Sequence, residues 1–157
     1  LAHMSESAEK LAFHVVHCSS EDHDYPASEL NTHSPHTRGW QAARFCEFPQ
    51  EIIVSFGRPV FVSQLQILSH QSKIARKIEL FVSMDPSLEL QHFRRLGYLS
   101  LDSNERSGFQ ARELKSVFVN SQLYLLRFVV HSCYVNKYNL FNQVGIIAIN
   151  ALGSADA

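Results

Sequence analysis

Carboxylate side chains gather in one polar segment near the start of the chain. Asp22, Asp24 and Glu29, with Glu21 beside them, fall within nine positions and alternate with serine residues. Calcium needs several oxygen ligands, and a loop that follows a strand can supply carboxylates and carbonyls together. No fixed ligand spacing is visible, so a solvated polar loop explains the same residues. Asp22, Asp24 and Glu29 are therefore candidate ligands of a structural calcium ion, weighed against that simpler alternative.

A second group of side chains is basic. Its members flank a polar turn at residues 102–108, and they are Arg94, Arg95, Arg106, Arg112 and Lys115. A hairpin at this turn would bring them to one end of the fold, where they would attract an acidic protein partner such as a carboxylate-rich tail. Glu105 and Glu113 lie among them, so scattered surface charge is an equal alternative.

A third segment, residues 136–143, is rich in asparagine and aromatic residues and joins two apolar runs. Asparagine tolerates turn conformations and hydrogen-bonds to local backbone, which explains the segment as loop architecture. Exposed aromatic side chains also anchor interfaces, which makes Lys137 and Tyr138 candidate partner-binding residues.

Motifs of enzymes are absent from the sequence. It contains no glycine-rich phosphate loop, no H-E-x-x-H, no G-x-S-x-G and no metal-spaced quartet of cysteine and histidine. Carboxylates pair only in the segment 21–29, and no nucleophile and base stand at a telling spacing. We expect a protein without enzymatic activity and with no cofactor beyond the candidate calcium.

The segments that must position these side chains have the composition of β-strands. Short runs rich in β-branched and aromatic residues alternate with turn signals, and they cover residues 11–18, 40–48, 51–56, 61–70, 74–83, 94–101, 113–119, 123–131 and 144–152. Only residues 87–95 show a weak helical pattern. The sequence predicts an all-β fold, an antiparallel sandwich or barrel of about eight strands.

Length and composition set the outer limits. The 157 residues suit one domain, which we place at residues 11–153, and 45% hydrophobic residues can supply its core. A net charge of −1 argues against broad binding to nucleic acid, and no run of about 18 apolar residues could span a membrane.

Cysteine usage and the first residues indicate where the protein works. Cys18, Cys46 and Cys133 form no even, dense disulfide set, so the reducing interior of a cell is expected. Residues 1–4 (LAHM) have the form of a cloning remnant, and the natural protein is expected to continue beyond the sequence shown.

Several blocks resemble known jelly-roll domains. YPASEL at 25–30 and Gly39-Trp40 resemble the opening of discoidin or galactose-binding-like jelly rolls. RFCEFPQEI at 44–52, FRRLGYLSL at 93–101, ARELKSV at 111–117 and VNKYN at 135–139 together resemble the N-terminal jelly-roll domain of a family of centrosomal and ciliary-tip proteins. The resemblance implies a jelly-roll β-sandwich in which Trp40 is a core residue.

The same resemblance implies a function. It indicates a non-enzymatic protein-interaction domain of a cytoskeletal, microtubule-associated protein that acts in cilium assembly and structural integrity. Its partners would be proteins at the distal end of the centriole or at the ciliary tip, with tubulin as a further candidate. The alternative is a calcium-stabilised carbohydrate- or ligand-binding module of the discoidin class.

Overall fold

The computed structural model describes residues 8–32 and 34–155, so the expected cloning remnant lies outside the described residues. The strands are β1 (Glu9–Lys10), β2 (His14–Cys18), β3 (Trp40–Gln41), β4 (Gln50–Ser69), β5 (Lys77–Ser83), β6 (Arg94–Ser100), β7 (Leu114–Val130) and β8 (Gly145–Ser154). Short 3-10 helices lie between some of them: η2 (Ala27–Asn31), η3 (Leu90–His92) and η4 (Glu105–Ser107).

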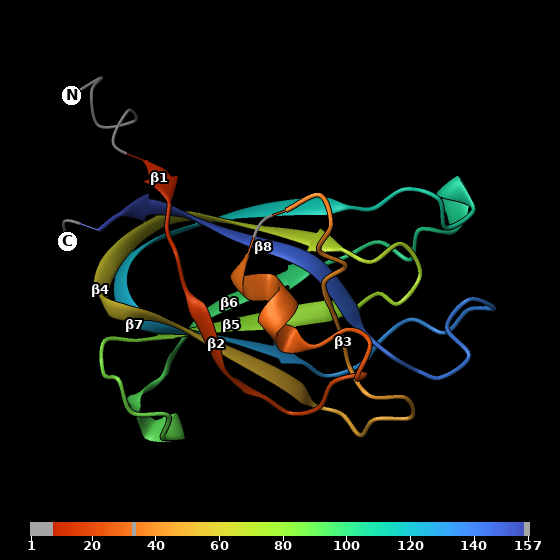
Figure 1. The fold of residues 1–157 in the computed structure, drawn as a ribbon, viewed down its shortest axis with the longest axis horizontal. Helices are drawn as coiled ribbons and strands as arrows, with labels where there is room; N and C mark the ends of the chain where they lie inside the picture. Colours follow the sequence, from red (N-terminus) through yellow and green to blue (C-terminus); the bar gives the residue numbers. More distant parts are fainter. Residues whose placement is uncertain (1–7, 33, 156–157) are drawn as a thin grey trace.

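Two long strands, β4 and β7, belong to both layers of the fold (Figure 1). Their halves at residues 50–55 and 125–130 pair with each other and with β2 and β5, and β5 pairs with β6. Their other halves pair together beside β8, which also carries β1 and β3. All of these pairings are antiparallel, which confirms the predicted eight-stranded jelly-roll sandwich.

The bends in β4 and β7 correct the predicted strand limits. Runs that the sequence separates, at 51–56 and 61–70, form the single strand β4, and those at 113–119 and 123–131 form β7. Gly57 turns the first with a φ of 75°, and Asn120 turns the second with a φ of 46°. The break that the sequence predicts between residues 56 and 61 is thus a bend within a continuous strand.

The core lies between the two layers. Alternate residues of the bent strands face it, including Val54 and Leu65 of β4 and Phe128 of β7, each at most 1% exposed. Trp40 is 1% exposed, and its indole Nε1 donates to the Ser20 carbonyl at 2.9 Å. The expectation that Trp40 is a core residue is confirmed.

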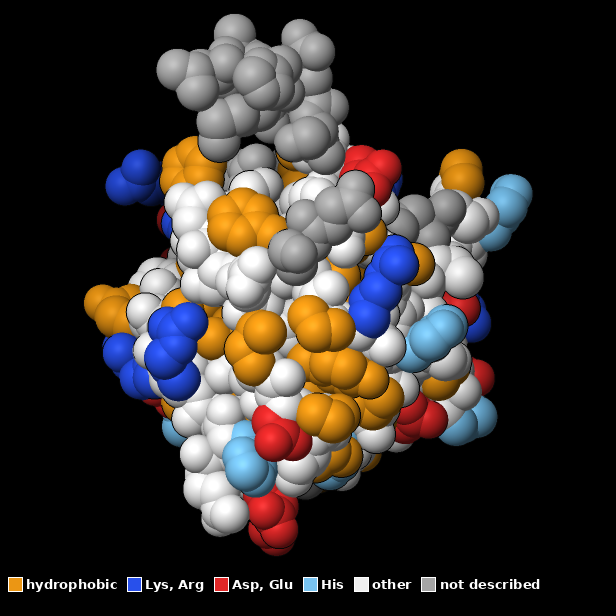
Figure 2. Space-filling view, turned by 90° about the vertical axis from the view of Figure 1, so that its left-hand side faces the viewer, with side chains coloured by type: hydrophobic (Ala, Val, Ile, Leu, Met, Phe, Trp, Pro, Cys, Tyr) orange, Lys and Arg blue, Asp and Glu red, His pale blue; other side chains and the backbone are white. Residues whose placement is uncertain are grey.

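The two ends of the sandwich differ in construction. Strand pairing places residues 19–26, 42–49, 70–76, 101–113 and 131–144 at one end, which we call the loop end; it lies at the right of Figure 1. The opposite end holds the strand bends, η3 and both ends of the described chain. Hydrophobic side chains gather near its centre (Figure 2). No helix in residues 8–32 and 34–155 is long and apolar enough to cross a membrane.

Candidate functional site

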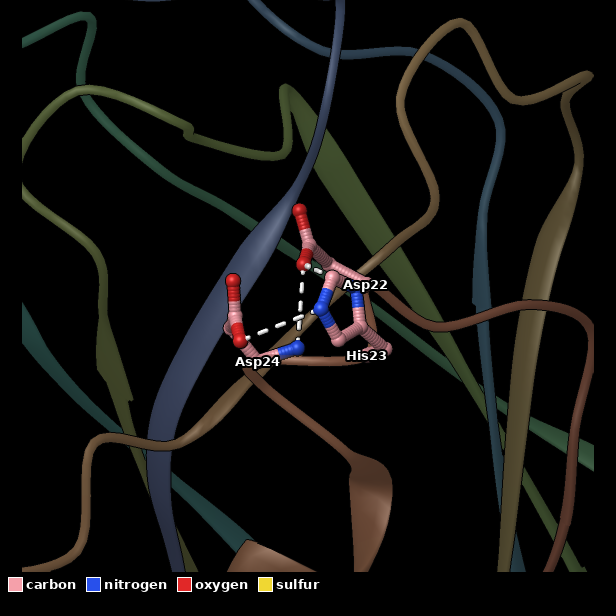
Figure 3. A group of neighbouring side chains, drawn as sticks. All are labelled: Asp22, His23 and Asp24. Carbon is pink, nitrogen blue, oxygen red and sulfur yellow. Dashed lines mark hydrogen bonds and ion pairs between the residues drawn. The ribbon is translucent and has the colours of Figure 1, made fainter.

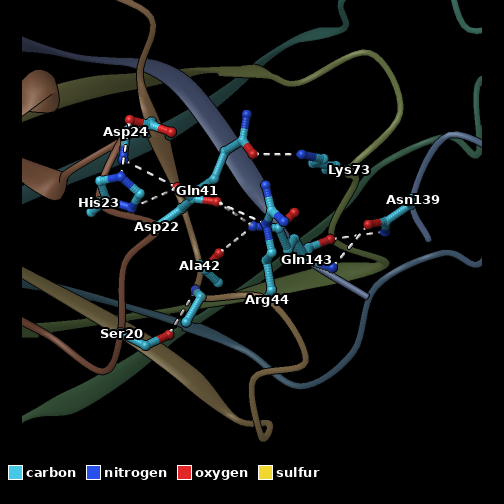
Figure 4. A network of polar contacts seen from close by, with 11 residues as sticks. Ser20, Asp22, His23, Asp24, Gln41, Ala42, Arg44, Lys73, Asn139 and Gln143 are labelled. Atoms are coloured by element: carbon cyan, nitrogen blue, oxygen red, sulfur yellow. Dashed lines mark hydrogen bonds and ion pairs between the residues drawn. The ribbon is translucent and has the colours of Figure 1, made fainter. Parts of the chain in front are cut away.

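The polar segment after β2 is held to the loop end through Asp22, whose side chain is 9% exposed (Figure 4). One carboxylate oxygen accepts from the backbone N–H of Asp24 at 3.1 Å, and the other accepts from the Gln143 amide at 3.2 Å. Arg44 Nε lies 3.7 Å from the second oxygen. These donors and the neighbouring cation lower the pKa of Asp22, with the Asp24 N–H as the largest cause.

Buried amides carry this connection across the loop end. Gln143, with 0% exposure, donates to Asp22 and also to the Ala42 carbonyl at 2.7 Å. Asn139 binds both the N–H and the C=O of Gln143, at 2.8 and 2.9 Å. Lys73 donates to the Gln41 side chain at 2.6 Å and borders the same network. Three loops far apart in sequence are thereby fixed against one another.

The structure groups only part of the candidate calcium set. Asp22, His23 and Asp24 offer ligand atoms within 4.8 Å of one another (Figure 3). Glu29 is outside this group, and its carboxylate accepts from the backbone N–H of Arg38 at 2.6 Å. The predicted set is therefore brought together at Asp22 and Asp24, where Arg44 already neutralises part of the charge.

An exposed phenylalanine and a half-buried one lie next to this network. Phe45 is 70% exposed, has a φ of 56°, and meets Phe141 edge-on at 5.6 Å between ring centres. Arg44 lies over the Phe141 ring at 4.4 Å, and the Phe45 N–H donates to the Phe141 carbonyl at 2.7 Å. We call Arg44, Phe45 and Phe141 the aromatic platform. A hollow of about 460 Å³ beside it is lined by Arg44, Asp22 and their neighbours.

A second hollow, of about 520 Å³, lies between the loops at 101–113 and 131–144. Phe109 and Tyr138 line it and meet edge-on at 5.4 Å. Arg112, also in its lining, donates to the Gln71 side chain at 3.0 Å, and Lys137 lies over the Tyr138 ring at 5.2 Å. The structure thus brings together three of the predicted partner-binding residues, Arg112, Lys137 and Tyr138.

The five basic residues flanking the turn at 102–108 do not form one patch. Arg94 and Arg95 pair with Val82 and Phe81 at the start of β6, beside η3, whereas the loop at 101–113 leaves the other end of that strand. Seven extended residues separate the two ends of β6 by about 20 Å. Arg95 is also paired with Glu79 at 2.8 Å.

The other basic residues have separate positions. Arg106 belongs to the exposed helix η4, and Lys115 lies on β7, 3.5 Å from Glu113. Arg112 lines the second hollow at the loop end.

Sequence reasoning missed Arg44 and Phe45 of the aromatic platform and Phe109 of the second hollow, whereas Phe141 lies in the aromatic segment 136–143 that it identified. Arg44 and Phe45 fall in a run that the sequence predicts as a strand from 40 to 48, whereas β3 ends at Gln41. The contact of Phe45 with Phe141 spans 96 positions, and no local sequence pattern indicates such a contact.

Comparison with known proteins shows the family of this chain. Residues 39–153 match the family model described as centrosomal protein CEP104, N-terminal domain. The chain is 42% identical over 149 residues to the human centrosomal protein of 104 kDa, and 41% identical to the mouse protein. Each alignment covers 92% of this chain and 16% of the relative, so the chain spans about a sixth of their length.

Solved structures show the same fold at low identity. A family 32 carbohydrate-binding module of Clostridium perfringens NanJ, solved with galactose, has a TM-score of 0.70 at 15% identity over 92% of this chain and 98% of that one. Another such module, from a family 31 glycoside hydrolase of the same organism, reaches 0.75 at 16% identity over 96% and 97%. Reduced XRCC1 bound to DNA polymerase β reaches 0.70 at 18% identity over 91% and 97%. These likenesses establish the discoidin-like sandwich and no more.

Proposed function

This chain belongs to the family of the N-terminal domain of centrosomal protein CEP104, and from this we propose that it is a non-enzymatic protein-interaction domain of a centrosome- and cilium-associated protein. In this proposal it recruits protein partners at the distal end of the centriole or at the ciliary tip, and so contributes to cilium assembly and integrity. The relatives are named as centrosomal proteins.

The aromatic platform carries the proposal. An exposed Phe45 and a Phe141 capped by Arg44 are held on loops that buried amides fix in place. Aromatic and arginine side chains are enriched at the centres of protein interfaces. Aromatic rings bury a large area at little cost in conformational entropy, because they have only two χ angles. Tyr138, 52% exposed beside the second hollow, extends the same surface.

Proximity labelling with the full-length protein in ciliated cells tests this function. We expect Phe45→Glu and Tyr138→Glu to lose distal-centriole or ciliary-tip neighbours that the unchanged protein labels. Leu90→Glu is the matched control, because Leu90 is 63% exposed in η3 at the opposite end. Equal labelling by the loop-end variants and the unchanged protein would refute the proposed surface.

A second candidate function is favoured by the hollow beside Asp22 and Arg44. A carboxylate and a guanidinium that face one hollow can bind hydroxyl groups, and the NanJ module of the same fold was solved with galactose. A glycan array probed with this chain tests the candidate. Binding that Arg44→Ala and Asp22→Asn abolish would support it, and an array without hits would eliminate it.

Calcium stabilisation through Asp22, Asp24 and Glu29 belongs to this second candidate. A bound ion would raise the melting temperature in millimolar calcium, and a chelator would reverse the rise. Asp24→Asn should remove the shift. A melting curve that is the same with calcium and with chelator rules the ion out.

A further inference from the structure

We call the layer that contains β8 and the halves of β4 and β7 at residues 60–69 and 114–123 the second layer. One edge of this layer is open. Residues 114–118 of β7 pair with residues 64–68 of β4, and among residues 8–32 and 34–155 no strand pairs with their other side. This stretch runs along the upper margin of the fold in Figure 1. An unprotected edge presents backbone donors and acceptors to any extended chain, so natural proteins usually blunt or cover it.

The alternation of backbone hydrogen bonds along β7 shows which N–H and C=O groups point out of the open edge. Ser69 N–H donates to the Glu113 carbonyl at 2.9 Å, so Glu113 directs its backbone polar groups toward β4. Antiparallel strands alternate, hence Lys115 and Val117 also face β4. Leu114, Ser116 and Phe118 therefore direct their N–H and C=O groups away from the sheet. Their side chains share the outer face and are exposed, Leu114 to 54% and Phe118 to 81%.

The outer face beside this edge carries no charged side chain over three strands. Strand register sets it in three rows, which are Leu114, Leu68 and Ala148; Ser116, Gln66 and Asn150; and Phe118, Gln64 and Leu152. Two apolar-ended rows thus flank a row of polar uncharged residues. Depletion of charge is the compositional mark of interface centres.

These features select a particular occupant. A rotation by half a turn about Ser116 places Leu114 opposite Phe118 of a second copy, and Ser116 opposite its equivalent. Leu114, Ser116 and Phe118 all direct their N–H and C=O groups out of the edge, as such a pairing needs, so about six backbone hydrogen bonds would form. No like charges lie directly opposite each other across the seam, because Lys115 is opposite Val117 of the second copy. Gln66 and Asn150 carry amides, which are both donors and acceptors and can therefore bind the same groups of a second copy.

We propose that this chain forms a two-fold dimer by antiparallel pairing of residues 114–118 of β7 with the same residues of a second copy. The two second layers then join into one continuous sheet whose outer face is free of charge on both sides of the seam. Residues 114–118 include no residue of the aromatic platform or of the lining of the second hollow, so the dimer can be tested independently of the partner-binding proposal.

Sedimentation equilibrium over a wide concentration range tests the dimer. The 17.9 kDa chain should approach twice its mass as concentration rises. Phe118→Glu should weaken association at least about tenfold, because symmetry places two buried charges in the seam. Ser116→Pro should do the same while the fold is kept, since its N–H makes no bond within the sheet. Val135→Glu, at a residue 76% exposed at the loop end, is the control.

A crosslink reports the register directly. Ser116→Cys places two thiols across the symmetry axis, at the Cα separation of about 5.5 Å that a disulfide accepts, so oxidation should give a covalent dimer that reductant reverses. Val135→Cys should give none beyond the background of the native cysteines. A chain that remains monomeric at every concentration, a Phe118→Glu variant that associates like the unchanged chain, or open-ended growth beyond the dimer would each overturn the proposal.

Discussion

His70 shows how a single side chain can be held in one protonation state by its surroundings. Its Nδ1 accepts the backbone N–H groups of Ser72 and Lys73, at 3.1 and 3.0 Å. Burial, followed by the nearby cations Lys73 and Arg112, lowers the pKa of His70 from 6.5 to about 4. The imidazole is thus a neutral acceptor that organises the loop bordering the second hollow.

The consequence is a loss of stability in mild acid. Below pH 6.5 the unfolded chain binds a proton at His70 that the folded chain does not, so the free energy of unfolding falls as pH drops from 6.5 toward 4. The loss reaches at most about 3.5 kcal/mol, from about 1.4 kcal/mol for each pKa unit. His70→Asn keeps an acceptor without titrating and should flatten this part of the curve in urea unfolding.

Gly39 illustrates a residue set by both backbone and packing. Its φ is 80°, and a Cβ there would lie 2.4 Å from the Ile146 carbonyl oxygen and 2.5 Å from Ile147 Cα. Gly57 has a similar φ of 75° but open space around it. Gly57→Ala should therefore cost about 1–2 kcal/mol from the left-handed conformation alone.

Gly39→Ala should cost clearly more than Gly57→Ala, because β3 must separate from β8 to admit the methyl group. Urea unfolding of the two variants measures the difference. Equal costs would mean that the contact with β8 relaxes freely and that only the backbone conformation matters.

At the scale of elements, the loop from 131 to 144 depends on one buried amide. Asn139 is 3% exposed and binds the Tyr134 and Gln143 carbonyls and the Gln143 N–H. Asn139→Ala should lower the free energy of unfolding by about 2–3 kcal/mol, since it leaves buried groups without partners. Val135→Ala, in the same loop but 76% exposed, should change it by less than about 0.5 kcal/mol. Similar effects of both substitutions in chemical unfolding would contradict this role of Asn139.

The strands also show how much of the fold could be predicted from the sequence. Alternation and turn residues locate most strands, because burial on one face imposes a period of two. They do not distinguish a turn from a bend, so β4 and β7 were each predicted as two strands. The strand predicted from 40 to 48 ends at Gln41, because Phe45 adopts a left-handed conformation in contact with a loop 96 positions away.

In the candidate site, too, residues could be predicted where the sequence signal is local, and contacts between distant segments could not. Lys137 and Tyr138 were identified because their segment is locally unusual, and Arg112 because it lies in a basic cluster. The links that build the loop end, such as Asp22 to Gln143, join residues 121 positions apart. The folded sandwich determines which cations lie at the same end. It places Arg94 and Arg95 at the end opposite Arg112.

At the scale of the whole molecule, the ends of the described chain are remote from the proposed partner surface. β1 pairs with the last residues of β8, Glu9 opposite Gly153, at the end away from the loops (Figure 1). Material joined there therefore extends away from the aromatic platform. This arrangement leaves the loop end accessible in a longer protein.

A pair of fusions tests this polarity. A folded domain joined after Ala157 should leave partner capture at the level of the unfused chain, within about twofold. The same domain inserted at Asn136 by flexible linkers should reduce capture at least tenfold, because it stands over Tyr138 and the second hollow. The captured protein is one that proximity labelling has already identified, and thermal melting checks that both fusions fold. Capture that survives the insertion but is lost on the fusion after Ala157 would move the partner surface to the opposite end, over the hydrophobic group seen in Figure 2.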